Sequence, residues 1–412
     1  ASGREVYAVM RVTVTTLSGL SCSLDVEPND PLTVRDLKQR AVENLFRSGP
    51  SANGTLAYRR LARQGAPLKD EQPLLSTEVC DSDNLVLVVV AATQLAVGFG
   101  DGGVSVLDVT APEGKLEQCS WRFGDAVVDL AWRPDGQSLA VASDFENTAG
   151  GASVIGRFAT FLVPSGEAKG SAAELQAPSA SVDWAPRASK ISRGLTVADK
   201  VRVHLPQDDG RPSTVLGLPA LRITSAGFGT AFLTEVCWSP DSSKIAIAVG
   251  GQNASGGVAI LAKDTERLLW SWDCWRAVHA VAWSPDGRYL AVGSGDIRSG
   301  GMICLLMDGR VERTWRKAGA VRSLSWNPDG SRLAAATCDW VRGSGALHIF
   351  SMESGEEERA WYMESVLNCV AWSPDGESVA AGLEDGLVRL LKPQGAEVRR
   401  MNLSAAVRKL SW

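Results

Sequence analysis

The chain has 412 residues, with 42 basic and 47 acidic side chains, a formal net charge of −5 and a hydrophobic content of 45%. This composition is ordinary for a globular protein, and the absence of a basic block excludes duplex nucleic acid as an expected partner. The longest apolar run, residues 85–92, is too short to cross a bilayer, so no membrane partner is expected. The eight scattered cysteines form neither a disulfide framework nor a zinc motif, which predicts a cytoplasmic or nuclear protein.

Residues 10–90 are predicted to form a separate α+β domain. Residues 11–17 and 21–27 alternate between apolar and polar side chains, which predicts a hairpin. Thr33 is placed to cap a helix whose apolar residues recur at helical spacing, namely Val34, Leu37, Ala41 and Leu45. Shorter strands are expected around residues 56–62, and the nearly all-apolar run 85–90 suits the centre of a sheet.

This order of elements resembles ubiquitin, the β-grasp fold. The stretches that carry the resemblance are Thr16-Leu-Ser-Gly, Leu24-Asp-Val-Glu-Pro-Asn-Asp, Gly65-Ala-Pro-Leu-Lys-Asp and Asn84-Leu-Val-Leu-Val. The resemblance implies that the recognition patch of the family corresponds to Leu17, Ala62 and Val88. The chain runs through this last strand into the next domain instead of ending in a free Gly-Gly, so conjugation is not expected. The domain either recruits a partner or has kept only the fold.

Residues 93–412 repeat one pattern, an alternating apolar run that ends in tryptophan and is followed by a turn such as Ser-Pro-Asp-Gly. The marker tryptophans recur roughly every 40–54 residues, at Trp132, Trp184, Trp238, Trp283, Trp326, Trp372 and Trp412. Proline, aspartate and glycine each suit one position of a tight turn, and a second alternating run follows. Each unit therefore predicts four antiparallel strands, which is one blade of a β-propeller.

The two ends of this region complement each other. Residues 94–123 predict three strands without a first strand, and the chain ends after a lone first strand at about residues 406–412. Together they predict a shared blade that closes a ring and limits exposed sheet edges. A truncated gene product is the alternative.

The repeats resemble the WD-repeat family of β-propellers. The resemblance rests on the x-Val-x-x-Val-x-Trp-Ser-Pro-Asp-Gly pattern and on Glu384-Asp-Gly-Leu-Val-Arg-Leu-Leu. No copy ends in Trp-Asp or begins with Gly-His, so the internal hydrogen-bond tetrad of that family is not expected, and bacterial Ser-Pro-Asp-Gly propellers are alternative relatives. The predicted fold is thus a ubiquitin-like domain (10–90) followed by an all-β seven-bladed propeller (93–412) closed by a shared N-/C-terminal blade.

Two sets of residues predict binding surfaces on the propeller. The first belongs to the long turns after the second strands, and comprises Trp340, Asp339, Arg342, Arg298 and Phe145. An aromatic residue with charged neighbours has the composition of an interface hot spot, although Trp340 could instead fold back on its own blade. The second set lies four residues before the marker tryptophans, at His279, Arg322, Asn368 and Arg408. If these residues face the channel mouth, they could dock an acidic peptide or phosphate; otherwise they are solvated.

No catalytic residue, metal site or cofactor is predicted. Residues 98–103 satisfy G-x-G-x-x-G, but no helix follows, so the segment predicts a hairpin turn rather than a phosphate site. The three histidines, His204, His279 and His348, lie in different units and form no metal or nucleophile motif.

The preferred interpretation is a non-enzymatic scaffold whose propeller binds a protein or peptide while the ubiquitin-like domain recruits a second partner. The domain order resembles Notchless-type ribosome-assembly factors, which implies association with a ribonucleoprotein. A ubiquitin- or proteasome-pathway adaptor is the alternative version. The less favoured hypothesis, from another class, is a propeller enzyme that acts at the channel mouth.

Overall fold

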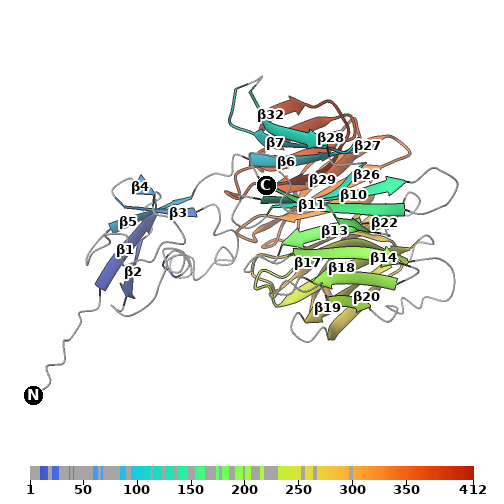
Figure 1. The fold of residues 1–412 in the computed structure, drawn as a ribbon, viewed down its shortest axis with the longest axis horizontal. Coiled ribbons are helices and arrows are strands. Elements are labelled where there is room, and N and C mark those ends of the chain that lie inside the picture. The colour runs from blue at the N-terminus through green and yellow to red at the C-terminus, as the bar shows by residue number, and fades with distance from the viewer. Residues whose placement is uncertain are drawn as a thin grey trace, which may run out of the picture. The chain divides into compact units, whose positions relative to one another are not determined.

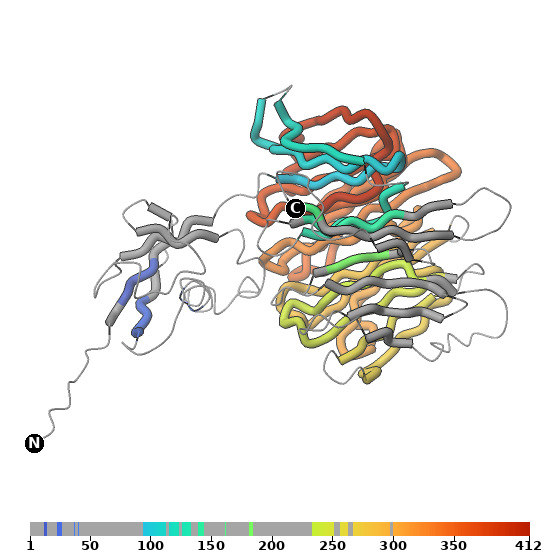
Figure 2. The backbone as a smooth tube through the Cα atoms, in the orientation of Figure 1, coloured from blue at the N-terminus to red at the C-terminus, as the bar shows by residue number. Residues whose placement is uncertain are grey.

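In the computed structural model, the chain divides into two compact units, Ala1–Ala91 and Ala92–Trp412. Figure 2 traces the backbone of both units from the N-terminus to the C-terminus. The described residues are 10–16, 21–26, 37, 40, 59–63, 66–67, 84–89, 94–112, 115–122, 126–132, 138–146, 154–162, 173–175, 179–184, 191–197, 200–205, 214–217, 231–251, 256–262, 267–296 and 300–412. Within them, no helix is both long enough and apolar enough to cross a membrane.

The first unit contains a five-stranded mixed sheet in the order β2-β1-β5-β3-β4. Its strands are β1 (Met10–Thr16), β2 (Ser21–Val26), β3 (Arg59–Arg63), β4 (Ala66–Pro67) and β5 (Asn84–Val89). β1 and β2 form the predicted antiparallel pair, and β1 lies parallel to β5, which occupies the predicted central position. Leu37 is helical and buried, as the predicted apolar stripe requires, whereas Val34, Ala41 and Leu45 lie outside the described residues.

The second unit consists, within the described residues, of seven four-stranded sheets (Figure 1). In six of these sheets the four strands are neighbours in chain order. Their strands are β9 (Val127–Trp132), β10 (Ser138–Glu146), β11 (Val154–Leu162) and β12 (Ala173–Leu175); β13 (Ser179–Trp184), β14 (Ile191–Val197), β15 (Lys200–Leu205) and β16 (Thr214–Gly217); β17 (Ala231–Trp238), β18 (Lys244–Gly251), β19 (Gly256–Ala262) and β20 (Leu268–Cys274); β21 (Val278–Trp283), β22 (Leu290–Asp296), β23 (Gly300–Met307) and β24 (Arg310–Lys317); β25 (Ala320–Trp326), β26 (Arg332–Asp339), β27 (Ser344–Ser351) and β28 (Glu357–Met363); and β29 (Leu367–Trp372), β30 (Val379–Leu383), β31 (Leu387–Leu391) and β32 (Glu397–Asn402).

The remaining sheet joins the two ends of the unit. It has the order β33-β6-β7-β8 and contains β6 (Gln94–Phe99), β7 (Gly103–Asp108), β8 (Glu117–Arg122) and the last strand, β33 (Val407–Ser411). β33 pairs antiparallel with β6, so Val407 faces Phe99 and Leu410 faces Val97. Residues 100–102 form the turn between β6 and β7, as the hairpin prediction for the glycine-rich segment requires.

The repeated sequence produces a repeated local structure. The first strands of six sheets end at their marker tryptophan, and Trp412 directly follows β33. The predicted turns follow, and the glycines of the best copies adopt left-handed backbone, with φ of 70° at Gly287 and 73° at Gly376. Ser242 adopts the same conformation, with φ of 59°, in the copy that has no glycine there. The turn geometry therefore follows from the position in the repeat even where the residue is less suited to it.

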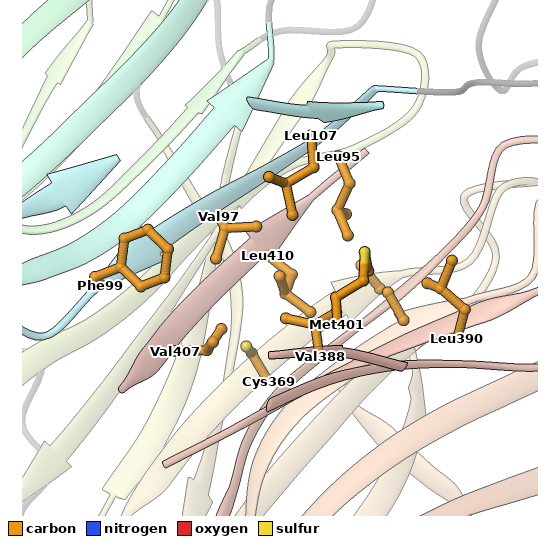
Figure 3. Close-up of a cluster of buried hydrophobic side chains, with 12 residues drawn as sticks. Leu95, Val97, Phe99, Leu107, Cys369, Val388, Leu390, Met401, Val407 and Leu410 are labelled. Carbon is orange, nitrogen blue, oxygen red and sulfur yellow. The ribbon is translucent and has the colours of Figure 1, made fainter. Parts of the chain in front are cut away.

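The buried apolar side chains lie between neighbouring sheets. The first strand of each sheet contacts the first strand of the next, from β9 through β13, β17, β21, β25 and β29 to β33, and β33 also contacts β9. Figure 3 shows one core, to which β33, β6, β7 and the adjacent sheet contribute Leu95, Val97, Phe99, Leu107, Cys369, Val388, Leu390, Met401, Val407 and Leu410. Stacked sheets bury what none of them could bury alone, as the repeat period predicts.

Candidate functional site

The two predicted sets of propeller residues lie at the same end of their strands. In the antiparallel pair of β25 and β26, Ala320 faces Cys338 and Val321 faces Thr337, so the start of the first strand lies beside the end of the second. The residues four before the marker tryptophans and the turns after the second strands therefore emerge together. We call this end of the sheets the loop face.

The turn between β26 and β27 presents a tryptophan on the loop face. Asp339 ends β26, and its Oδ1 accepts hydrogen bonds from the backbone N–H groups of Val341 and Arg342, each 3.1 Å long. These bonds stabilise a compact turn, a common use of aspartate. Trp340 is 42% exposed and Val341 79% exposed. The turn thus displays two large apolar side chains that a partner could cover.

Arg322 joins the two predicted sets. Its guanidinium carbon lies 5.5 Å from the centre of the Trp340 ring, in a cation–π contact. Arg322 is half-buried, and among the described residues no carboxylate forms an ion pair with it. Trp340 therefore packs against Arg322, which belongs to the second predicted set. The N–H groups at the edge of the guanidinium stay available for a ligand.

Asn368 and Arg408 share one carboxylate, which the sequence did not single out as a site residue. Asn368 Nδ2 donates to Glu384 Oε2 at 2.7 Å and to the carbonyl of Val407 at 2.8 Å. Arg408 Nη1 lies 3.1 Å from the same Glu384 oxygen. Asn368 is buried rather than solvated, and its Oδ1 has no hydrogen-bond partner in the described part of the chain. Glu384 thus neutralises Arg408 and orients the amide.

His279 lies on β21 and is half-buried. Its Nε2 lies 2.9 Å from the carbonyl oxygen of Gly295, so this nitrogen carries the proton and donates. Burial lowers the pKa of His279; the hydrogen bond to Gly295 opposes this effect, whereas the nearby positive charge of Arg322 adds to it. The imidazole is consequently neutral at neutral pH and responds to the charge state around Arg322.

A buried ion cluster one residue further along the first strands was not predicted. Lys409 Nζ lies 3.0 Å from Asp129 Oδ1 and 2.8 Å from Glu235 Oε1. The Lys409 side chain is 26% exposed, and those of Asp129 and Glu235 are 5% and 18% exposed. Burial alone would lower the pKa of Lys409, but the two carboxylates raise it above its ordinary value. The sequence signal that could have indicated this cluster is a charged residue three positions before the marker tryptophan, as in Asp129, Glu235 and Lys409.

The same position also connects neighbouring sheets. Asp129 Oδ2 accepts from the backbone N–H of Val182 at 2.9 Å, and Glu235 Oε2 accepts from that of Val281 at 2.7 Å. Serines repeat the pattern, since the hydroxyl of Ser181 accepts from Val236 N–H and that of Ser323 from Val370 N–H. These residues therefore bind adjacent first strands together, and most of their capacity is used structurally.

The other predicted residues are not brought into this site by any described contact. Phe145 lies near the end of β10, where it faces Ile155, and Arg298 lies outside the described residues. In the first unit, Ala62 of β3 faces Val86 of β5, and Val88 faces Arg60, so the two patch residues lie on adjacent strands. Leu17 lies outside the described residues.

His348 belongs to a buried set of polar side chains in the described part of the chain. No cluster of three or more His, Cys, Asp or Glu residues there could hold a metal ion. His348 Nδ1 lies 2.6 Å from Glu357 Oε1, and its Nε2 lies 3.0 Å from Thr337 Oγ1. This buried set is an internal hydrogen-bond network of one sheet, which the sequence had not led us to expect. It stabilises the sheet and does not reach the loop face residues described above.

Comparison with known proteins identifies the fold. The family model described as WD domain, G-beta repeat matches residues 267–297, 309–341 and 363–391. The crystal structure of the Cps50 (Swd1) beta-propeller domain from Myceliophteria thermophila matches with a TM-score of 0.53 and 15% sequence identity, and covers 76% of this chain and 93% of its own. The fold is a β-propeller, and the WD-domain model matches three segments of it. A comparison with curated proteins found no match.

Proposed function

We propose that the chain is a non-enzymatic scaffold whose propeller binds a protein or peptide on the loop face while the first unit recruits a second partner. WD40 propellers generally mediate protein–protein interactions. The observation that carries the proposal is the pair formed by exposed Trp340 and half-buried Arg322. Tryptophan and arginine are enriched among the residues that contribute most binding energy in protein interfaces. Here Trp340 keeps an exposed ring surface, and Arg322 has no ion pair among the described residues.

A rigid platform is part of the proposal, in the form of a seven-bladed ring closed by the sheet β33-β6-β7-β8. Three interactions of different kinds support closure. β33 pairs with β6, Trp132 Nε1 donates to the carbonyl of Ser411 at 3.1 Å, and Lys409 is ion-paired with Asp129. Each joins the last strand to residues from the start of the unit. A closed ring presents the loop face without the mobility of a free sheet edge.

We further propose that the first unit is a ubiquitin-like domain. The order β2-β1-β5-β3-β4, with β1 parallel to β5, and the buried helical Leu37 support it. Such a domain would link the propeller's partner to a ubiquitin-pathway complex or, as domain order suggests, to a ribosome-assembly complex. The six described cysteines that are free support a reducing compartment, the cytoplasm or nucleus.

A pull-down with the full chain and three variants tests the scaffold. Trp340→Ala and Arg322→Ala remove the two loop face groups, and Leu269→Ala, an exposed apolar residue of β20, is the matched control. We expect both loop face variants to lose a partner that the parent chain and the control retain, with unchanged circular dichroism. Identical partners in all four proteins would refute the assignment of the binding face.

A further inference from the structure

We infer that the loop face selects acidic peptides, in which an aspartate or glutamate stands next to a bulky apolar side chain. This inference rests on the proposed binding function of the face and names the class of ligand. It follows from Arg322, a half-buried cation of this face that has no ion pair among the described residues and stacks on an aromatic ring, and from the apolar side chains displayed beside it.

The positive groups of the face differ in how they are neutralised. Arg342 Nε lies 3.7 Å from Asp339, Arg408 is paired with Glu384, and Lys409 is held between Asp129 and Glu235. Arg322 has no ion pair among the described residues, although it is half-buried. A half-buried charge is poorly solvated, so it gains more from an incoming carboxylate than an exposed one would.

The contact with Trp340 prepares Arg322 for a planar anion. A guanidinium over an aromatic ring keeps its N–H groups at its edge, where they match the two oxygens of a carboxylate. The ring also restricts the arginine side chain, so less conformational entropy is lost when a ligand binds. Asn368 lies on the next first strand, at the position equivalent to Arg322; its Nδ2 already donates to Glu384 and to the carbonyl of Val407, so its Oδ1, which has no described partner, would accept from a peptide N–H and would not bind the carboxylate.

The apolar part of the ligand is recognised by the same blade. Trp340 and Val341 lie on the turn between β26 and β27, and Tyr362, 81% exposed, faces Ala346 on the neighbouring strand. Ala346 is the third residue of β27, so Tyr362 lies close to the loop end of β28. Three large side chains at one end of a blade can cover a leucine or phenylalanine placed beside the acid.

Charge separates acidic from basic ligands. A lysine or arginine of the ligand near Arg322 would face a like charge that has no ion pair among the described residues, and two carboxylates of this face, Asp339 and Glu384, already contact arginines. Basic peptides are therefore disfavoured at this position, and neutral apolar peptides gain only the contacts with the aromatic residues.

The test is a positional-scanning library of immobilised synthetic peptides, probed with the full-length chain at physiological and at high salt. We expect retained peptides to be enriched in Asp or Glu adjacent to Leu, Phe or Trp, with weaker retention at high salt. The best peptide should bind Arg322→Gln at least tenfold more weakly and Arg322→Lys more weakly than the parent, because lysine lacks the planar fork. Arg310→Gln, which removes an exposed arginine from the opposite end of β24, where it faces Met307, should bind as the parent does.

A second readout follows the histidine next to Arg322. The positive charge of Arg322 contributes to the lowered pKa of His279, so a bound carboxylate should raise that pKa, as measured by NMR in a chain with only three histidines. The retained peptides could show no preference for acidic residues and yet fail to bind Trp340→Ala. That result would overturn the selection by charge but would support the loop face as the binding surface. If no peptide is retained by any protein, both the inference and the peptide-binding role of the face fail.

Discussion

Replacing Lys409 by methionine tests whether the last strand is tied into the ring. Lys409 Nζ makes hydrogen-bonded ion pairs of 3.0 and 2.8 Å with Asp129 and Glu235, which come from two other first strands. Methionine keeps the length of the side chain and removes the charge. Two mostly buried carboxylates are then left close together without a cation.

The expected loss of stability can be estimated from these contacts. Removal of one partner of a buried ion pair typically destabilises a protein by about 3–5 kcal/mol. Partial exposure of Lys409 and Glu235 lets water compensate some of this, so we expect the lower end, about 3 kcal/mol. Removing one carboxylate as well, in Lys409→Met/Glu235→Gln, should recover part of the loss, because one like charge disappears.

Urea unfolding of the full chain, followed by tryptophan fluorescence and circular dichroism, measures the effect. The midpoint should fall in Lys409→Met while the slope with urea stays unchanged. Lys392→Met is the control, since Lys392 is exposed and should change stability by less than about 0.5 kcal/mol. A loss below about 1 kcal/mol for Lys409→Met, or no recovery in the double variant, would refute the ion cluster as a tie between strands.

Two further predictions concern titratable groups in the cores. Burial lowers the pKa of His348 below its ordinary 6.5, in spite of its hydrogen bond to Glu357. Below pH 6.5 the unfolded chain therefore binds a proton that the folded chain does not, and stability falls by up to about 1.4 kcal/mol per pH unit. Thermal unfolding between pH 7.5 and 5.5 should show a shallower decline in His348→Gln, and equal slopes would contradict this origin. Burial raises the pKa of the Cys369 thiol to about 12. A thiol reagent at pH 8 should modify half-buried Cys119 before Cys369, as mass spectrometry would show, and equal rates would argue against the burial of Cys369.

The repeat itself was predictable because it depends on local chemistry. Strand alternation, a marker tryptophan and a turn containing proline, aspartate and glycine act over about ten residues. These signals located the first strands, their tryptophans and the left-handed glycines at Gly287 and Gly376. The three strands in residues 94–123 were predictable for the same reason, and the missing first strand indicated where their partner must come from.

The site was only partly predictable. Trp340, Arg322, Asn368 and Arg408 were singled out as candidates from their positions in the repeat, but the sequence treated the turn and the first strands as separate surfaces. Their union depends on the register of β25 and β26 and on how the side chains pack, as the contact between Arg322 and Trp340 shows. Glu384 was not singled out as a site residue because it lies in a short turn, where an acidic side chain is ordinarily solvated.

The sequence by itself determined that this protein is built from stacked four-stranded units, because each unit's strands and turns are encoded by neighbouring residues. Only the tertiary structure decided that Arg322 stacks on Trp340 without an ion pair among the described residues, and that Lys409 pairs with carboxylates of two other first strands. Arg322 and Lys409 are both basic, and each is the third residue of a first strand. The partners of Lys409 come from chain segments far apart in sequence, and only sheet packing brings them within hydrogen-bonding distance. Arg322 instead meets Trp340 through the register of β25 and β26.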